Sequence, residues 1–114
     1  MIRVNDDNIM ISKKDVVNKY FYLPDYVFNS GDKFYFTVSK LNEDKTKTVK
    51  LNIEMQVESD DDGKCFLKLN IPSQQINALN EENYIYDIRY VSGTDEFTLN
   101  YPKLFIVKGV AHDV

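Results

Sequence analysis

The chain is poor in residues on which much protein chemistry depends: its 114 residues include one cysteine, one histidine and no apolar run longer than four residues. A single cysteine excludes a disulfide within the chain and fits synthesis in a reducing, intracellular compartment. The apolar runs are far shorter than the roughly 20 residues that a membrane-spanning helix needs. The first residues also lack the basic and then apolar layout of a signal peptide. We therefore expect no membrane partner.

Positive charge is not concentrated either. The 14 lysines and arginines are scattered along the sequence, and the formal net charge is −4. Nucleic-acid binding requires a basic patch or stripe, so we expect no nucleic-acid partner. The sequence also has no glycine-rich phosphate loop, no paired carboxylates in a plausible cleft and no metal-ligand spacing. We expect a protein that is not an enzyme and that binds neither a cofactor nor a metal.

The most regular feature that is present is an alternation between positions 49 and 57. Apolar residues occupy the odd positions and polar residues the even ones: Val49, Leu51, Ile53, Met55 and Val57 against Lys50, Asn52, Glu54 and Gln56. A period of two predicts a strand with one face in a core and one in water. The pattern resumes on odd positions from 65 to 71, after an Asp62-Gly63 turn. The two segments are therefore predicted to form a hairpin.

Other short strand-like runs are separated by turn signals. We predict strands near residues 2–4, 9–12, 18–23, 33–40, 48–58, 64–71, 83–91, 96–101 and 103–108. One helical turn is predicted near 73–79, because Ile76 and Leu79 lie three residues apart after Pro72. The pattern predicts an all-β fold, an immunoglobulin-like antiparallel β-sandwich of eight or nine short strands that forms one domain over residues 1–114. The alternative is a small closed barrel.

Three features that could carry chemistry each have a simpler interpretation. The acids at 58–62 before Gly63 match the first half of a calcium-binding loop, but Leu69 stands where the final glutamate belongs. A solvated hairpin turn is the better interpretation. Cys65 shares a strand face with apolar residues and is predicted to be a buried, inert thiol. His112 is interpreted as a tail residue, because no serine or cysteine neighbour suggests a catalytic triad.

Two further features suggest contacts with a partner. Asp87 and Arg89 share a strand face, which indicates either an ion pair on a sheet or a recognition pair. The sequence also has eight tyrosines, a residue type enriched among those that dominate binding energy. We expect Tyr20, Tyr22 and Tyr35 to lie on neighbouring early strands, on faces opposite the apolar residues. We predict that these tyrosines, Asp87 and Arg89 form an interface; for the tyrosines, packing within the sandwich is the alternative.

Several segments resemble those of small structural proteins from phages of Gram-positive bacteria. The matching segments are Ser12-Lys13-Lys14-Asp15, Tyr22-Leu23, the run from Gly31-Asp32 to Lys40, Leu79, Tyr84-x-Tyr86-Asp87-Ile88, Phe97-Thr98-Leu99 and Phe105-x-Val107. They cover most of the chain and are similar to the amino-terminal domains of baseplate upper proteins, which are immunoglobulin-like sandwiches that dock on the tail's central core. Two positions depart from the family's pattern, because Lys14 and Asn83 stand where glycines are expected.

The resemblance implies a virion structural protein at the tail, baseplate or neck of a phage or phage-like particle. Such a protein is synthesised in the bacterial cytoplasm and contacts other virion proteins, in multiple copies around a symmetric particle. Its contacts are expected to spread over a patch of roughly 800 Å² per partner. The alternative is a carbohydrate-binding module for host-surface glycans, which would need an exposed aromatic platform formed by Tyr20, Tyr22, Tyr35 and Tyr90.

Overall fold

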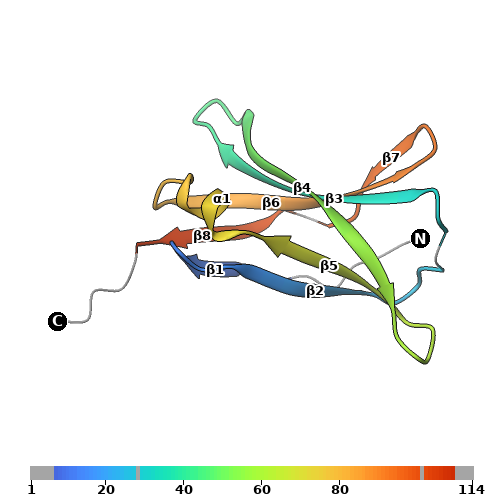
Figure 1. Cartoon of the computed structure of the whole chain (residues 1–114). Helices are drawn as coiled ribbons and strands as arrows, with labels where there is room; N and C mark the ends of the chain where they lie inside the picture. The colour runs from blue at the N-terminus through green and yellow to red at the C-terminus, as the bar shows by residue number, and fades with distance from the viewer. Residues whose placement is uncertain (1–6, 28, 101, 110–114) are drawn as a thin grey trace.

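The protein is described by a computed structural model that covers residues 7–27, 29–100 and 102–109. Within these ranges it forms eight strands and one short helix, which confirms the all-β prediction (Figure 1). The strands are β1 (Ile9–Ser12), β2 (Val17–Leu23), β3 (Asp32–Leu41), β4 (Lys47–Ser59), β5 (Cys65–Ile71), β6 (Asn83–Ser92), β7 (Asp95–Thr98) and β8 (Lys103–Lys108), with helix α1 (Ser73–Asn77) between β5 and β6. The strand predicted near residues 2–4 and the tail residue His112 lie outside the described residues.

The strands form a sheet that folds over into two layers. They follow the hydrogen-bonded order β1-β8-β6-β3-β4-β5-β2, with β7 beside β6. Strand β4 belongs to both layers, because its first part pairs with β3 and its last part, from Gln56 to Ser59, pairs with β5. We call β1-β8-β6-β3-β4 the large sheet and β4-β5-β2 the small sheet (Figure 1). The result is an immunoglobulin-like sandwich that is nearly closed. Among the described strands, β1 departs from antiparallel pairing, because it runs parallel to β8.

An irregularity between β3 and β4 corrects one part of the predicted register. Met55 is buried and Leu51 and Ile53 are half-buried, whereas Val49 is 57% exposed. Val38 pairs with Leu51, but the next residue, Ser39, already pairs with Val49. Because a slip of one residue moves a side chain to the other face of a sheet, Val49 leaves the core side at this bulge. The even-numbered residues are exposed as predicted: Lys50, Asn52 and Glu54.

Three aromatic rings join the two layers at the centre of the core. Phe21 from the small sheet lies 6.1 Å from Phe36 and 6.2 Å from Tyr86 of the large sheet, measured between ring centroids. Phe36 and Tyr86 stack at 4.6 Å. All three side chains are buried. In antibody domains a disulfide and a tryptophan join the sheets at the centre. Here aromatic packing does so without a disulfide, and Cys65 is a free, buried thiol as predicted.

The connection from β5 to β6 carries a further immunoglobulin-like feature. Helix α1 confirms the helical turn predicted near 73–79, and Ile76 and Leu79 are both buried. The hydroxyl of Tyr84 then accepts a hydrogen bond from the backbone N–H of Asn80 at 3.0 Å and donates one to its carbonyl at 3.2 Å. This arrangement is a tyrosine corner, in which a tyrosine near the start of a strand binds backbone a few residues upstream. It fixes the corner at which β6 begins.

The turn between β1 and β2 explains why a glycine is expected at position 14. Lys14 has a φ angle of 74°, in the left-handed region that favours glycine. Its backbone N–H donates to the side chain of Asn77 at 2.8 Å, and the N–H of Ser12 donates to the Asp15 carboxylate at 3.0 Å. These bonds hold the turn, so the lysine takes the conformation of the missing glycine.

Candidate functional site

The five predicted interface residues do not share one surface. Tyr20 and Tyr22 lie on β2 in the small sheet, whereas Tyr35, Asp87 and Arg89 lie on β3 and β6 in the large sheet. The expectation that the three tyrosines lie on neighbouring strands is wrong, because β2 pairs with β5, while β3 pairs with β4 and β6. Their outward orientation is confirmed: Tyr20 is 52% exposed, and Tyr22 and Tyr35 are half-buried.

The large sheet brings three of the five together. Tyr35 on β3 is the direct cross-strand partner of Arg89 on β6, and Thr37 is that of Asp87. Since cross-strand partners point to the same side of a sheet, these residues share one face. It is the face opposite the core residues Phe34 and Phe36, and we call it the outer face.

Tyr90 points the other way, into the sandwich. Its ring stacks on Phe34 with 4.9 Å between the centroids, and its hydroxyl donates to the Asp32 carboxylate at 2.8 Å. Tyr20 and Tyr22 belong to the small sheet and Tyr35 to the large one. The four tyrosines of the carbohydrate alternative therefore do not form one exposed platform.

A polar cluster that the sequence did not reveal surrounds Asp32. Its Oδ2 accepts hydrogen bonds from the hydroxyls of Tyr26 at 2.7 Å and Tyr90 at 2.8 Å. Partial desolvation raises the pKa of Asp32, but the hydrogen bonds from Tyr26, Tyr90 and Ser92 outweigh it, and the net pKa is lowered. Burial and the bond to Asp32 together raise the pKa of Tyr26. The cluster pins the loop that leads into β3, because the Tyr26 hydroxyl also accepts the Asn29 N–H at 3.1 Å.

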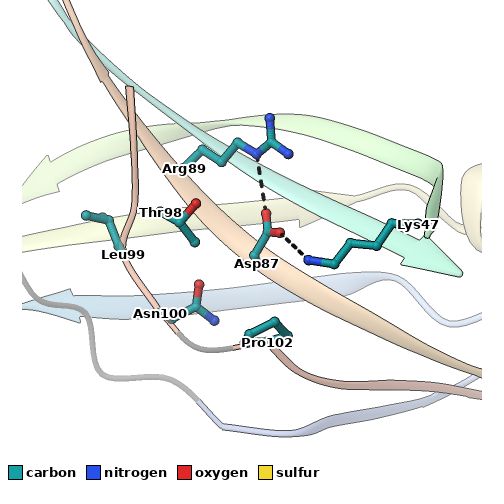
Figure 2. Close-up of a pocket in the computed structure, with 7 residues that line it drawn as sticks. All are labelled: Lys47, Asp87, Arg89, Thr98, Leu99, Asn100 and Pro102. Atoms are coloured by element: carbon teal, nitrogen blue, oxygen red, sulfur yellow. Dashed lines mark ion pairs between the residues drawn. The ribbon is translucent and has the colours of Figure 1, made fainter. Parts of the chain in front are cut away.

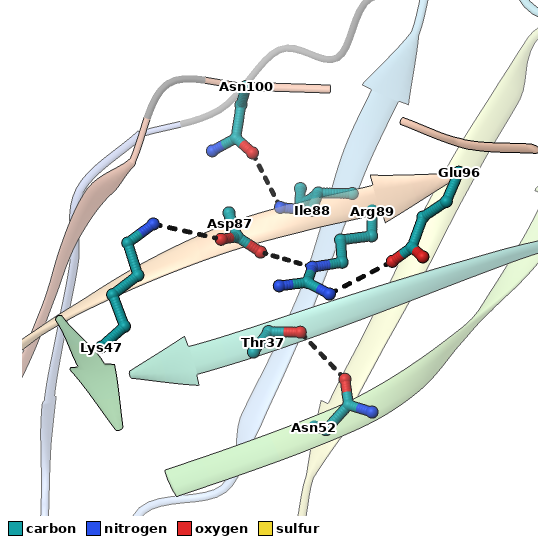
Figure 3. A network of polar contacts seen from close by, with 8 residues as sticks. All are labelled: Thr37, Lys47, Asn52, Asp87, Ile88, Arg89, Glu96 and Asn100. Atoms are coloured by element: carbon teal, nitrogen blue, oxygen red, sulfur yellow. Dashed lines mark hydrogen bonds and ion pairs between the residues drawn. The ribbon is translucent and has the colours of Figure 1, made fainter. Parts of the chain in front are cut away.

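Asp87 is the most unusual polar residue of the outer face. It is only 7% exposed. Its two carboxylate oxygens form ion pairs of 3.6 Å with Arg89 Nε and 3.9 Å with Lys47 Nζ (Figure 3). Both distances are too long for hydrogen bonds. Among the described residues, Oδ1 has no hydrogen-bond partner. The charge of the carboxylate is thus compensated, whereas Oδ1 is buried without a hydrogen bond from any described residue.

Asp87 borders an open pocket of about 570 Å³ (Figure 2). The pocket is lined by Lys47, Asp87, Arg89, Thr98, Leu99, Asn100 and Pro102. These residues come from the start of β4, the middle of β6, and the end of β7 with the segment that joins it to β8. The pocket therefore exists only in the folded chain, because it assembles three distant segments of sequence.

Side-chain bonds fix the walls of this pocket (Figure 3). Arg89 is held on its far side by Glu96, with 3.1 Å between its guanidinium and the Glu96 carboxylate. The predicted strand near 96–101 ends at Thr98. Beyond it, the side-chain oxygen of Asn100 accepts the backbone N–H of Ile88 at 2.7 Å. The Asn100 side chain thus accepts the hydrogen bond that a backbone carbonyl of a neighbouring strand would otherwise accept. The backbone of this segment is no longer paired with β6 as a strand, and it forms the pocket wall before β8 begins.

Next to the pocket, apolar side chains cross the outer face. Ile85 pairs with Leu104 on β8 and with Ser39 on β3, and Ser39 pairs with Val49 on β4. Four of the side chains in this band are largely exposed: Met10 60%, Leu41 54%, Val49 57% and Leu104 41%. We call the following set the apolar band: Met10, Leu41, Val49, Ile85, Leu104 and Ile106. One signal could have found part of it, since the apolar run 104–107 places apolar side chains on both faces of its strand.

Two hairpins border the outer face. Figure 1 shows the tips of the β3–β4 and β6–β7 hairpins rising on the side of the large sheet that is turned away from β2 and β5. Leu41 and Lys47 form the last cross-strand pair before the turn of the first hairpin, and Arg89 and Thr98 lie on the second. Both hairpins contribute to the pocket, because Lys47 belongs to the first and Thr98 to the second.

The acidic turn near 60–63 is a self-contained hairpin loop. The Asp60 carboxylate accepts the backbone N–H groups of Asp62 at 3.0 Å and Lys64 at 2.8 Å, and Gly63 has a φ angle of 81°. One of the oxygens that a calcium ion would need is thus engaged by the turn. Within the described ranges, no group of three or more histidine, cysteine or acidic side chains is placed to hold a metal ion.

Comparisons with known proteins add little. No family model and no curated protein matches the chain. A solved structure that resembles it is a DUF4784 family protein from Bacteroides caccae, with 13% sequence identity and a TM-score of 0.47. The match covers 95% of this chain but only 23% of that one, and a likeness this distant carries no argument about function.

The described part of the chain contains no helix long and apolar enough to cross a membrane.

Proposed function

We propose that this chain is a structural protein of a phage or phage-like virion, an assembly module at the tail, baseplate or neck. It works without catalysis, through contacts with other virion proteins that it meets in several copies around a symmetric particle. The resemblance of its segments to baseplate upper proteins supports the virion setting. The outer face of the large sheet supports the mode of action.

The observation that carries this proposal is the apolar band. Exposed apolar side chains that stand singly are common, but several that gather on one face of a sheet are typical of an interaction surface. Burying one Val, Leu, Ile or Met side chain completely contributes roughly 1.5–3 kcal/mol. Covering the band would thus supply much of the energy of a specific complex. The polar residues beside the band match the usual anatomy of an interface, with an apolar centre and a polar rim.

The test is a double substitution, Val49→Ser with Leu104→Ser, in the genetic element that encodes the chain. Both side chains are largely exposed, so the free energy of unfolding should change by only about 0.5 kcal/mol per site. We expect normal folding, measured by thermal unfolding, and loss of the chain from purified particles.

The matched control is Val16→Ser with Val27→Ser, because these valines are 57% and 84% exposed but lie outside the outer face. The control should be incorporated like the wild type. If both double mutants enter particles normally, the outer face is not the docking surface. A glycan array probed with the isolated wild-type chain distinguishes the carbohydrate alternative, which predicts binding there and no incorporation defect in either mutant.

A further inference from the structure

The small sheet carries three aromatic side chains on the face that is turned away from the core. Along β2 and β5 the buried residues alternate with Tyr20, Tyr22 and Phe66, so these rings point outward. Tyr22 is the cross-strand partner of Phe66, and their ring centroids lie 5.3 Å apart. Tyr20 is two residues from Tyr22 on the same strand and is 52% exposed. We call Tyr20, Tyr22 and Phe66 the aromatic cluster.

A polar pocket of about 270 Å³ adjoins the aromatic cluster. Lys68 on β5 pairs with Tyr20 on β2 and with Gln56 on β4, so the pocket and the rings share one face of the sheet. The volume is just below the roughly 300 Å³ at which pockets for drug-sized ligands begin, and it suits a single small ring. The side chains that line the pocket are all accessible to solvent: Glu54, Gln56, Lys68 and Asn70.

The charges on this face cancel one another. Lys68 Nζ lies 3.9 Å from the Glu58 carboxylate, and Lys33 Nζ lies 3.7 Å from that of Glu54. A nucleic-acid base also stacks on aromatic rings, but its backbone requires a positively charged groove. Two cations matched by two anions do not form such a groove. The face therefore favours an uncharged ligand.

The polar groups of the pocket indicate the chemistry of that ligand. The side-chain amides of Gln56 and Asn70 each offer hydrogen-bond donors and an acceptor, and the Glu54 carboxylate accepts. A ligand that matches them has groups that both donate and accept. A ligand that also matches the aromatic cluster has an apolar face that packs on a ring. A sugar ring combines the two, because its hydroxyls surround the ring and its C–H groups form the faces.

A protein partner fits this face less well than a sugar does. The centre of a protein interface is depleted of charged residues, and its polar residues lie at the rim. On this face, charged side chains stand directly beside the rings: Glu58 is the cross-strand partner of Phe66, and Lys68 is that of Tyr20. A protein that covered the rings would have to bury these charges as well.

We propose that the outward face of the small sheet binds a neutral oligosaccharide. One sugar ring stacks on the aromatic cluster, and the next exchanges hydrogen bonds with Glu54, Gln56 and Asn70 in the pocket. This inference goes beyond the proposed function and does not depend on it, because the apolar band lies on the large sheet, in the other layer of the sandwich. A chain docked through that band keeps the sugar-binding face free.

The experiment probes a glycan array, which carries neutral, anionic and amino-sugar oligosaccharides, with the purified full-length chain. We expect the wild type to bind neutral glycans. Tyr20→Ser combined with Tyr22→Ser should weaken this binding about tenfold or more, because both stacking rings are lost. The matched control is Phe97→Ser, which removes a 50% exposed ring from β7 of the large sheet. It should bind like the wild type.

A second variant tests the pocket without touching the rings. Gln56→Ala removes one amide from an exposed position, and losing its hydrogen bonds should weaken glycan binding roughly threefold to tenfold. Its thermal unfolding should stay that of the wild type, which guards against an effect on folding. Gln74→Ala, the same change at an exposed position of helix α1, is the control. If Gln56→Ala binds like this control, the pocket takes no part in binding.

Four results would overturn the inference: no glycan bound by the wild type, a preference for anionic glycans, equal binding by the wild type and the tyrosine double mutant, or wild-type binding by Gln56→Ala. Incorporation into particles separates it from the proposed function. The tyrosine double mutant should enter particles normally, and Val49→Ser with Leu104→Ser should still bind glycan. If the tyrosine double mutant is lost from particles and the wild type binds no glycan, the small sheet is a protein interface instead.

Discussion

Asp32 lies on β3 and Asp87 on its neighbour β6, but the two carboxylates have different kinds of polar partner. Asp32 is at the start of β3 and receives hydroxyl hydrogen bonds from Tyr26 and Tyr90. Asp87 is in the middle of β6, is more deeply buried, and forms long ion pairs with Lys47 and Arg89. The first carboxylate is satisfied by its own fold and is part of the structure. No described residue donates a hydrogen bond to Oδ1 of the second, whose charge is compensated instead by Lys47 and Arg89.

The largest expected effect comes from removing both donors to Asp32. Tyr26→Phe combined with Tyr90→Phe should lower the free energy of unfolding by about 2 kcal/mol, because each hydroxyl bond contributes roughly 1 kcal/mol at a partly exposed carboxylate. Denaturant unfolding measures the difference. Tyr35→Phe is the control, since the Tyr35 ring is also half-buried but lies on the outer face, and it should stay within about 0.5 kcal/mol of the wild type. A double mutant as stable as this control would show that the Asp32 cluster is not structural.

The two aspartates should respond in opposite ways to the same change. Asp32→Asn should cost about 1 kcal/mol, because the amide accepts more weakly from the two tyrosine hydroxyls. Asp87→Asn should leave the stability within about 0.5 kcal/mol of the wild type or raise it, since long ion pairs to exposed cations contribute little and the buried charge is removed. Thermal unfolding of both variants at neutral pH makes the comparison. A large loss at Asp87 would mean that its ion pairs are structural after all.

A smaller effect appears in the dependence of stability on pH. Because the folded state lowers the pKa of Asp32, the carboxylate's contribution is present above its unfolded pKa, near 4, and is lost as the pH falls through the lower folded value. Unfolding followed from neutral to acidic pH should therefore show a steeper acid loss in the wild type than in Asp32→Asn. If the wild type and Asp32→Asn lose the same unfolding free energy on acidification, Asp32 has no structural role.

The raised pKa of Tyr26 acts at the alkaline end. Its contribution to stability is complete below pH about 10 and is lost above it.

The smallest effect is expected at a third aspartate, Asp60, whose carboxylate is occupied by two backbone N–H groups of its own turn. Millimolar calcium should leave the melting temperature unchanged, because the loop is a solvated turn and not a metal site. A site occupied at a hundredfold excess over its dissociation constant would stabilise the fold by roughly 2.7 kcal/mol. Differential scanning calorimetry with and without calcium would reveal such a shift, and a clear increase would contradict the turn interpretation.

Much of the fold was predictable because its signals are local. The alternation from 49 to 57, the Asp62-Gly63 turn and the helical spacing of Ile76 and Leu79 each depend on residues close together in the chain. The observed strands and helix α1 follow these signals closely. The exposed position of Val49 was not predictable, because it depends on a bulge that appears only when β3 pairs with β4.

In the candidate site, too, some features follow from local sequence patterns and others only from strand pairing. The sequence by itself determined the all-β class, the alternation of most strands and the outward orientation of Tyr35 opposite the buried Phe34 and Phe36, since side-chain direction along a strand is set by its period of two. Only the tertiary structure decided that Tyr20 and Tyr22 lie on a different sheet from Tyr35, and that Oδ1 of Asp87 is buried without a hydrogen bond from any described residue. Those facts depend on which strands become neighbours: β6 lies between β3 and β8, and of its neighbours only β7 follows it directly through a short turn.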